Sequence, residues 1–90
     1  ERNYVTPLGE IDLIARQGKV LVVVEVKTRR GSSFGAPQEA VTPTKQGRLR
    51  RLADYYLKQK GLTGTPVRFD VVAVTLAGDE PQVEIIPNAF

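Results

Sequence analysis

An unbroken apolar run at residues 20–24 ends directly in charged side chains, and this junction constrains the fold more than any other part of the sequence. A short continuous apolar run is typical of a strand that is buried on both faces at the centre of a sheet. Glu25 and Lys27 follow the run at once, and Glu10 and Asp12 open the apolar segment before it. Because a buried charge is costly unless it is paired or binds a metal, these charges need a specific role. The role that we favour is a divalent-metal site suited to phosphodiester chemistry.

The two apolar segments are predicted to form a β-hairpin. Gln17 and Gly18 suit a two-residue turn between residues 11–16 and 19–28, with glycine supplying the positive φ that such turns require. Side chains alternate along a strand, so Glu10 and Asp12 are expected to share one face. The same alternation places Glu25 and Lys27 together on the next strand. An even loop length puts all four groups on the same side.

The expected register brings the acids within reach of one ion. Arg16 is expected to pair with Lys19, which places Glu10 opposite Glu25. Asp12 then lies diagonal to Glu25. Directly opposed Cβ atoms are about 5 Å apart and diagonal ones about 7 to 8 Å apart, so the carboxylates can converge on a cation. Without a cation they would repel, and one of them would be pushed toward protonation.

A helix is predicted in the second half of the chain, after a loop at residues 29–38. Thr42 suits the N-cap, and Pro43 suits the first helical position. We expect the helix to run to about Gln59 and to stop at Gly61. Its apolar stripe at i, i+3, i+4, i+7 and i+8 consists of Leu49, Leu52, Ala53, Tyr56 and Leu57. This face is expected to pack on the sheet.

Two more strands are predicted at residues 67–75 and 82–86, separated by turn residues. With the hairpin and the helix they give an α/β fold, in which a main helix packs on a sheet. Arg68 and Asp70 lie on the first of these strands, and we expect them to form a structural pair rather than a catalytic one. A length of 90 residues suits a single domain, residues 1–90.

The composition restricts metal ligands to oxygen atoms. The sequence contains no cysteine and no histidine, which excludes disulfides, thiolate or imidazole metal sites and the triads built on histidine. Oxygen ligands favour magnesium or manganese. The longest apolar run is far shorter than the roughly 20 residues of a membrane helix, and no signal-peptide pattern is present, so we expect a cytoplasmic protein without a membrane partner. The chain begins at Glu1 and contains no methionine, so we expect a fragment.

Basic residues concentrate in the predicted helix. Residues 45–60 contain six Lys or Arg against one acid, Asp54. This surplus suits a polyanion such as nucleic acid, although a solvated helix face accounts for it equally well. The apolar stripe, extended one turn toward the N-terminus, reaches Lys45 and Gln46, which therefore point toward the sheet. A phosphate at that place would also meet the positive end of the helix dipole.

A resemblance to a known family is carried by five segments in order: GEIDLIAR, VVVEVKTRR, FGAPQEAVTPTKQGRL, RFDVVAV and IIPNAF. Across nearly the whole chain they resemble the bacterial YraN-like uncharacterised family. An acid, then E-x-K, then a helix with Lys and Gln in its first turn resembles the PD-(D/E)XK nuclease superfamily. The resemblance implies a restriction-endonuclease-like mixed sheet and a likeness to Holliday-junction resolvases. The family normally has an N-terminal helix before this point, and we expect this chain to be a fragment that lacks it.

The resemblance also implies roles for individual residues. Asp12 and Glu25 would bind the metal together with the main-chain carbonyl of Val26. Lys27 would orient the attacking water or hold the scissile phosphate. Gln46 would support the site from the helix, or it caps the helix instead. Magnesium or manganese would be the cofactor.

The remaining candidate residues lie around this group. Glu10 is expected to be a further ligand, to hydrogen-bond a metal-bound water, or to be neutralised by a neighbouring basic residue. Lys45 and Arg48 on the helix, with Arg29 and Arg30 beyond the motif, are expected to contact nucleic acid, most simply DNA. An apolar sheet surface left bare by the missing helix invites a homodimer.

Three function classes follow from this pattern. The first is a magnesium-dependent endonuclease that hydrolyses phosphodiester bonds of DNA, branched or nicked. The second is a nucleic-acid-binding module of the same fold without catalysis, because E-x-K geometry can persist as a scaffold. The third is a structural protein whose basic helix docks on another macromolecule.

Overall fold

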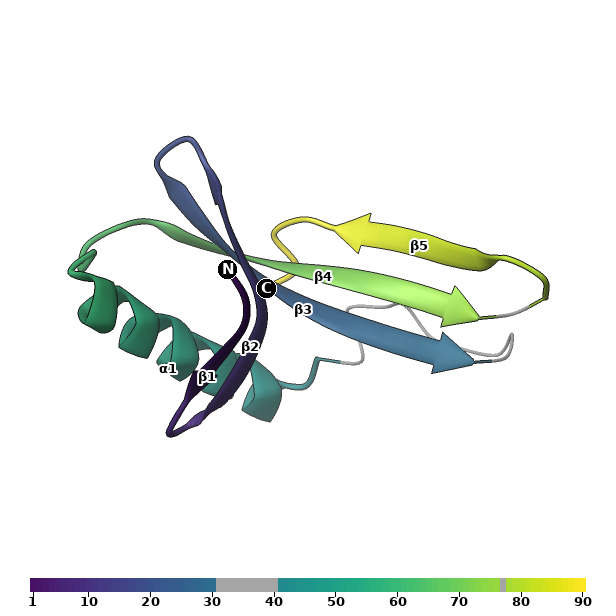
Figure 1. Ribbon diagram of the computed structural model, residues 1–90, viewed down its shortest axis with the longest axis horizontal. Helices are drawn as coiled ribbons and strands as arrows, with labels where there is room; N and C mark the ends of the chain where they lie inside the picture. Colours follow the sequence, from purple (N-terminus) through teal and green to yellow (C-terminus); the bar gives the residue numbers. More distant parts are fainter. Residues whose placement is uncertain (31–40, 77) are drawn as a thin grey trace.

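A central strand and the helix that follows it in the chain organise the fold (Figure 1). The computed structural model describes residues 1–30, 41–76 and 78–90. The elements in chain order are β1 (Arg2–Thr6), β2 (Gly9–Gln17), β3 (Val20–Arg30), α1 (Pro43–Lys60), β4 (Val67–Leu76) and β5 (Pro81–Ile86). The strands form one sheet in the order β1-β2-β3-β4-β5, with β3 and β4 parallel and the other neighbours antiparallel. The predicted α/β architecture with a mixed sheet and a main helix is confirmed.

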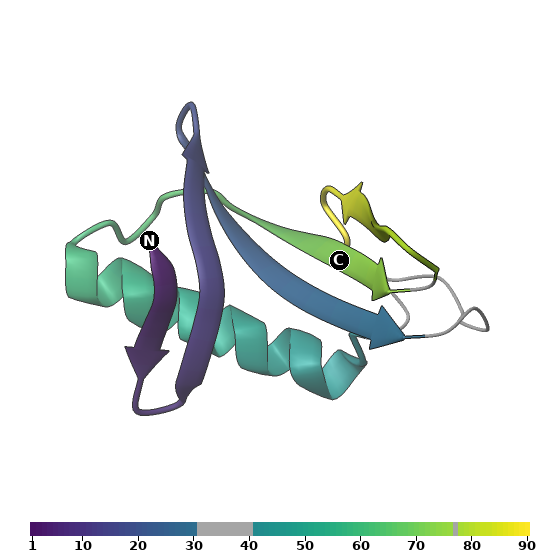
Figure 2. The same cartoon turned by 45° about the vertical axis from the view of Figure 1, so that its right-hand side comes forward.

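α1 packs on one face of the sheet and forms the core with it (Figure 2). The predicted stripe is buried: Leu49, Leu52, Ala53, Tyr56 and Leu57. It packs with buried residues of three strands, namely Ile11, Ile14, Leu21, Val23, Phe69 and Val71. Leu52 and Val71 are fully buried, and burying one such side chain stabilises the fold by about 1.5 to 3 kcal/mol. The helical periodicity of the sequence therefore predicted correctly which residues of α1 are buried in the core.

Both ends of α1 follow from the local sequence. The Thr42 hydroxyl accepts a hydrogen bond from the Lys45 N–H at 3.3 Å, and Pro43 is the first helical residue. At the other end Gly61 takes a left-handed φ of 68°, and the Leu62 N–H donates to a carbonyl of the last turn. The predicted start and stop are confirmed. Within the described residues no helix is long and apolar enough to cross a membrane, and the cytoplasmic location stays a prediction.

The turn between β2 and β3 differs from the predicted one. Gln17 is still part of β2, so Gly18 and Lys19 form the turn, with Gly18 at a φ of 59°. The predicted pairing of Arg16 with Lys19 is wrong, because Arg16 pairs with Leu21. The register is therefore shifted by two residues. An even shift leaves the paired side chains of β2 and β3 on their predicted faces.

Two strand features were not predicted. β1 pairs with β2 although its five residues show no apolar alternation, and Asn3 within it takes a positive φ of 53°. β3 continues through Arg29 and Arg30, which pair with the end of β4, so the first two residues of the predicted loop are strand. Local pattern could not reveal either feature, because both depend on a partner strand that is already in place. Residues 31–38 of the predicted loop lie outside the described residues.

The sheet face opposite α1 exposes apolar side chains toward β5. Val26, Val83 and Ile85 are 40%, 62% and 65% exposed. Val72 pairs with Val26 on one side and with Ile85 on the other, so these side chains share that face. An apolar sheet surface was expected from the sequence. The homodimer stays a prediction.

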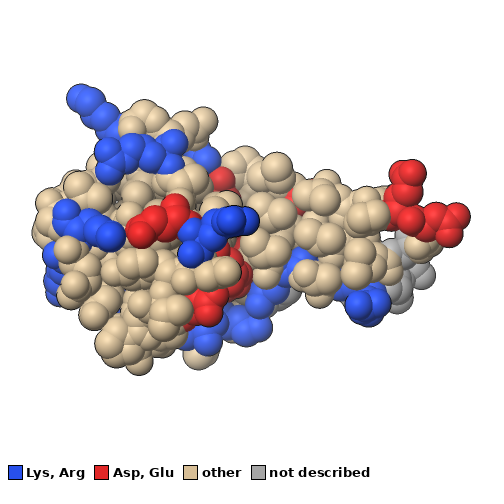
Figure 3. Space-filling model, viewed as in Figure 1, with Lys and Arg blue, Asp and Glu red and all other residues tan. Residues whose placement is uncertain are grey.

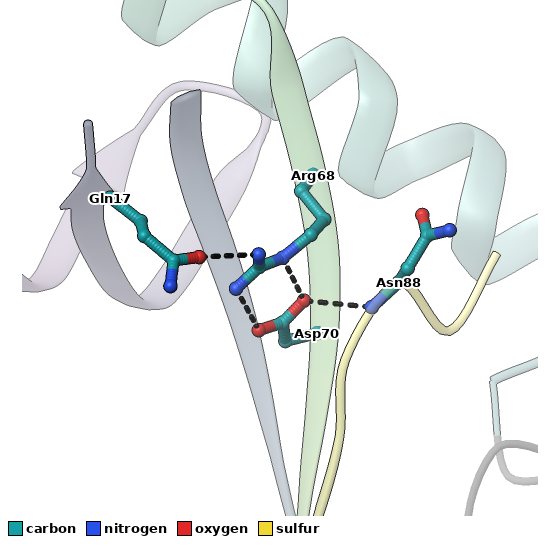
Figure 4. Close-up of polar contacts among 4 residues, drawn as sticks. All are labelled: Gln17, Arg68, Asp70 and Asn88. Carbon is teal, nitrogen blue, oxygen red and sulfur yellow. Dashed lines mark hydrogen bonds and ion pairs between the residues drawn. The ribbon is translucent and has the colours of Figure 1, made fainter. Parts of the chain in front are cut away.

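A buried ion pair joins the hairpin, β4 and the C-terminal segment (Figure 4). Arg68 donates from Nε and Nη2 to the two carboxylate oxygens of Asp70 at 2.9 Å each, and from Nη1 to Gln17 Oε1 at 2.5 Å. The Asn88 N–H also donates to Asp70 at 2.9 Å. Burial alone would raise the pKa of Asp70, but the hydrogen bonds from Arg68 and Asn88 outweigh it and hold that pKa below its usual range. The predicted structural pairing of Arg68 with Asp70 is confirmed.

Asp70→Ala is expected to lower the free energy of unfolding by about 1 to 3 kcal/mol, because it leaves Nε and Nη2 of Arg68 and the Asn88 N–H without their acceptor. Urea unfolding measures this change. The folded-state pKa of Asp70 is depressed, so its contribution is present above the unfolded-state pKa and is lost as pH falls through the folded value. The exposed Asp54→Ala control should change stability by less than about 0.5 kcal/mol. Equal losses for the two variants would refute the anchoring role of Asp70.

Candidate functional site

Two carboxylates meet where β2 leaves β3. The β2–β3 ladder ends at the pair Leu13–Val24, so Asp12 and Glu25 are the next residues of the two strands. The Asp12 carboxylate accepts a hydrogen bond from the Val26 N–H at 2.9 Å. Glu25 in turn interacts with the Asp12 side chain through a hydrogen bond and through its charge. The structure therefore brings the two acids together on adjacent strands, as predicted.

The alternation of β2 is interrupted between Ile11 and Ile14. Ile11 and Ile14 are both in the core, at 1% and 4% exposure, although a regular strand would point them to opposite faces. Glu10 is exposed and pairs with Val5 of β1. The predicted position of Glu10 opposite β3 is wrong, because the register is shifted and the alternation changes between the two isoleucines. Its role as a further ligand stays a prediction.

The carboxyl group of Glu25 is strongly perturbed. Its pKa is raised from 4.5 to about 7. Partial burial is the largest cause, followed by the hydrogen bond and the negative charge of Asp12, whereas Lys27 and Arg48 act in the opposite direction. Near neutral pH, Glu25 therefore holds a proton for part of the time in the absence of a cation. A bound cation would replace that proton.

Positive side chains flank the acid pair. Lys27 is half-buried and follows Glu25 by two residues, which places both on one face of β3. Arg48 extends from the beginning of α1, and its charge reaches Glu25. α1 packs closely against the start of β2. A Cβ atom added at Gly9 would lie only 3.8 Å from the side chain of Leu52. Figure 3 shows acidic side chains in the lower middle of this face, with basic side chains below them and to their right.

The other predicted residues lie at the start of α1 and at the end of β3. Gln46 donates its side-chain amide to the Val41 carbonyl at 3.1 Å, just before the helix begins, and its role in the site stays a prediction. Lys45 is half-buried in the first turn of α1. Arg29 is half-buried and Arg30 is exposed at the end of β3, with Arg29 on the face of the acid pair. Sequence reasoning missed the influence of Arg48 on Glu25, which only the packing of α1 against β2 creates.

The donor set suits a small, hard cation. In a β-strand the N–H and the C=O of one residue point to the same edge of the strand. The Val26 N–H donates to Asp12, so the Val26 carbonyl also points to the edge of β3 that faces Asp12. Two carboxylates and this carbonyl are oxygen donors of the kind that Mg²⁺ uses, since it binds through one or two carboxylates and keeps several waters. Among the described residues no group of three or more acidic side chains is placed to hold a metal. Water would therefore complete the coordination.

The fold and the site define a small α/β protein with a carboxylate pair midway along its central strand, just beyond the buried run. A sequence model of "Uncharacterised protein family UPF0102" matches residues 1–74. The UPF0102 protein of Moorella thermoacetica is 55% identical over 92 residues, covering 100% of this chain and 77% of the relative. The protein therefore belongs to the UPF0102 family.

Two further relatives give the same result. UPF0102 protein GSU0650 of Geobacter sulfurreducens is 50% identical over 91 residues, covering 100% of this chain and 71% of the relative. The UPF0102 protein of Dictyoglomus turgidum is 47% identical over 92 residues, covering 100% of this chain and 78% of the relative. The YraN-like resemblance seen in the sequence is thereby confirmed at the level of the family.

Glu25→Gln is expected to stabilise the metal-free protein increasingly as pH rises. The raised folded-state pKa of Glu25 contributes stability that is fully present below pH 4.5 and is lost as pH rises through about 7. Thermal unfolding in a chelator from about pH 5 to 8 measures the difference in Tm between variant and wild type, which should grow with pH. The exposed Glu84→Gln control should show no such trend. A difference for Glu25→Gln that does not vary with pH would mean that the folded-state pKa of Glu25 is not raised.

Proposed function

We propose that this protein is a magnesium-dependent endonuclease of the PD-(D/E)XK superfamily that hydrolyses phosphodiester bonds of DNA. The observation that carries the proposal is the contact between Asp12 and Glu25 at the point where β2 leaves β3. Lys27 lies on the same face, and the Val26 carbonyl lies on the Asp12 side of the strand. Two acids and one lysine just beyond the buried half of β3, on a mixed sheet with a packed helix, support this superfamily.

Each residue of the group has a distinct part in the proposed mechanism. The Val26 N–H fixes the direction of the Asp12 carboxylate. Glu25 would lose its proton on binding a cation, because only the carboxylate form is a ligand. When bound between them, Mg²⁺ or Mn²⁺ would polarise a phosphoryl oxygen and lower the pKa of a bound water, so that no histidine base is needed. Lys27 orients the attacking water or holds the scissile phosphate.

The positive charge around the acid pair supports DNA as the substrate. Lys45 and Arg48 lie at the start of α1, and Arg29 and Arg30 lie at the end of β3, so the acid pair is flanked on two sides. Lys and Arg side chains commonly bind the phosphate oxygens of a nucleic acid. Such contacts position the nucleic acid but do not recognise its base sequence. Branched or nicked DNA is the proposed form, on the strength of the resemblance to Holliday-junction resolvases.

A nucleic-acid-binding module without catalysis is the second candidate. Two observations favour it: within the described residues no third acid joins the pair, and the Gln46 side chain donates to the Val41 carbonyl. The same basic residues would serve either function. Docking on a protein partner is a third candidate, and it differs from both in salt dependence, since phosphate contacts make affinity fall steeply as salt rises.

In magnesium, the wild-type protein is expected to cleave a junction, flap or nicked DNA substrate. Asp12→Asn and Lys27→Met should each lower the single-turnover cleavage rate by at least about 100-fold while DNA binding persists, because each removes a group that acts on the reacting phosphate. Lys19→Met removes the same charge as Lys27→Met at the exposed hairpin turn and should cleave like the wild type.

Titration calorimetry with Mg²⁺ or Mn²⁺ provides the matching binding test. We expect heat of binding for the wild type and none for Asp12→Asn, because Asp12 contributes one of the two carboxylates. No cleavage of any substrate in this panel, together with no heat of metal binding, would eliminate the nuclease and favour the module without catalysis.

A further inference from the structure

The outer side of α1 carries a line of basic residues that starts beside the acid pair. Arg48, Arg51 and Lys58 are exposed, and Tyr55 is half-buried. These positions are three or four residues apart, so their side chains lie along one side of the helix. Arg48 is the member whose charge reaches Glu25. We call Arg48, Arg51, Tyr55 and Lys58 the helix ridge.

The charge of the ridge is not neutralised by ion pairs within the described part of the chain. There, the ion pairs join Lys60 to Glu1 at 3.7 Å and Arg68 to Asp70 at 2.9 Å, and neither involves the ridge. Asp54 is the single acid of α1, and it is exposed beside the ridge. Three cations against one acid leave this side of the helix positive.

Other basic residues of α1 are engaged in packing, which distinguishes them from the ridge. The Arg50 guanidinium lies 5.9 Å and 5.5 Å from the ring centroids of Phe69 and Phe90. The Lys60 ammonium lies 5.8 Å from the rings of both Tyr4 and Tyr56. These two cations stabilise the fold through the aromatic faces that they cover. The ridge cations have no such contact among the described residues.

We propose that the helix ridge binds the sugar–phosphate backbone of DNA that leads away from the acid pair. From Arg48 to Lys58 the helix rises about 15 Å, the length of about four base-pair steps. Basic side chains at this spacing add affinity that does not depend on sequence. The proposal rests on the proposed function for the position of the reacting phosphate, but the ridge binds DNA whether or not the strand is cut.

The test compares two double variants that lose the same charge. Arg51→Gln/Lys58→Gln removes two cations from the ridge, and Arg16→Gln/Lys19→Gln removes two exposed cations from the β2–β3 hairpin. Binding to a labelled mixed-sequence DNA duplex of about 30 base pairs is followed by fluorescence anisotropy from about 50 to 200 mM salt. Calcium replaces magnesium, so that binding is measured without cleavage.

The ridge variant is expected to bind about tenfold more weakly than the wild type at the middle of this salt range. Its slope of log affinity against log salt should be smaller in magnitude by about 1.8, the value for two lost phosphate contacts. The hairpin variant should change the slope by less than half as much. Asp54→Asn should bind about two- to threefold more tightly, since it removes the one negative charge beside the ridge, and a variant that merely unfolds could not produce this gain.

Equal weakening by the two double variants, or no change in the ridge variant, overturns the proposal. A cleavage assay in magnesium with the same proteins separates this outcome from failure of the proposed function. Loss of binding in the ridge variant without any cleavage by the wild type would support the ridge and refute the nuclease. Cleavage by the wild type with unchanged binding in the ridge variant would refute the ridge alone.

Discussion

The structure depends on β3 being buried along its first half and open beyond it. From Leu21 to Val24 the strand is buried on both faces, with β2 and β4 bonded to its two edges. The β2 ladder then ends, and Glu25 is the first residue of β3 beyond the buried run. The core therefore fixes the backbone that carries the charged residues, and their positions do not depend on a ligand. A site on a rigid strand holds its geometry better than a site on a loop.

The sequence predicted those features that depend on local pattern. The buried face of α1, its Thr42 cap and the central position of β3 all follow from periodicity and end residues. The register of the β2–β3 hairpin and the pairing of Glu10 with β1 could not be predicted from local pattern. Both depend on how β2 runs between β1 and β3. The acid pair was still found, because a shift of two residues preserves the side of the sheet.

The acid pair and the helix ridge belong to one electrostatic arrangement. Partial burial and then Asp12 raise the pKa of Glu25, and Lys27 and Arg48 partly offset that effect from the strand and the helix. Arg48 is also the first member of the helix ridge, so the negative centre and the positive surface meet at the beginning of α1. A polyanion on the ridge and a cation between the acids would each neutralise charge that the folded chain leaves in place.

The most direct test of the account is a crystal structure of the protein grown with saturating manganese, recorded with anomalous data. We predict one anomalous peak in contact with the carboxylates of Asp12 and Glu25 and the main-chain carbonyl of Val26, at metal–oxygen distances of about 2 Å. A map with no peak there, and the two carboxyl groups still hydrogen-bonded to each other, would contradict the central claim that this pair is a cation site.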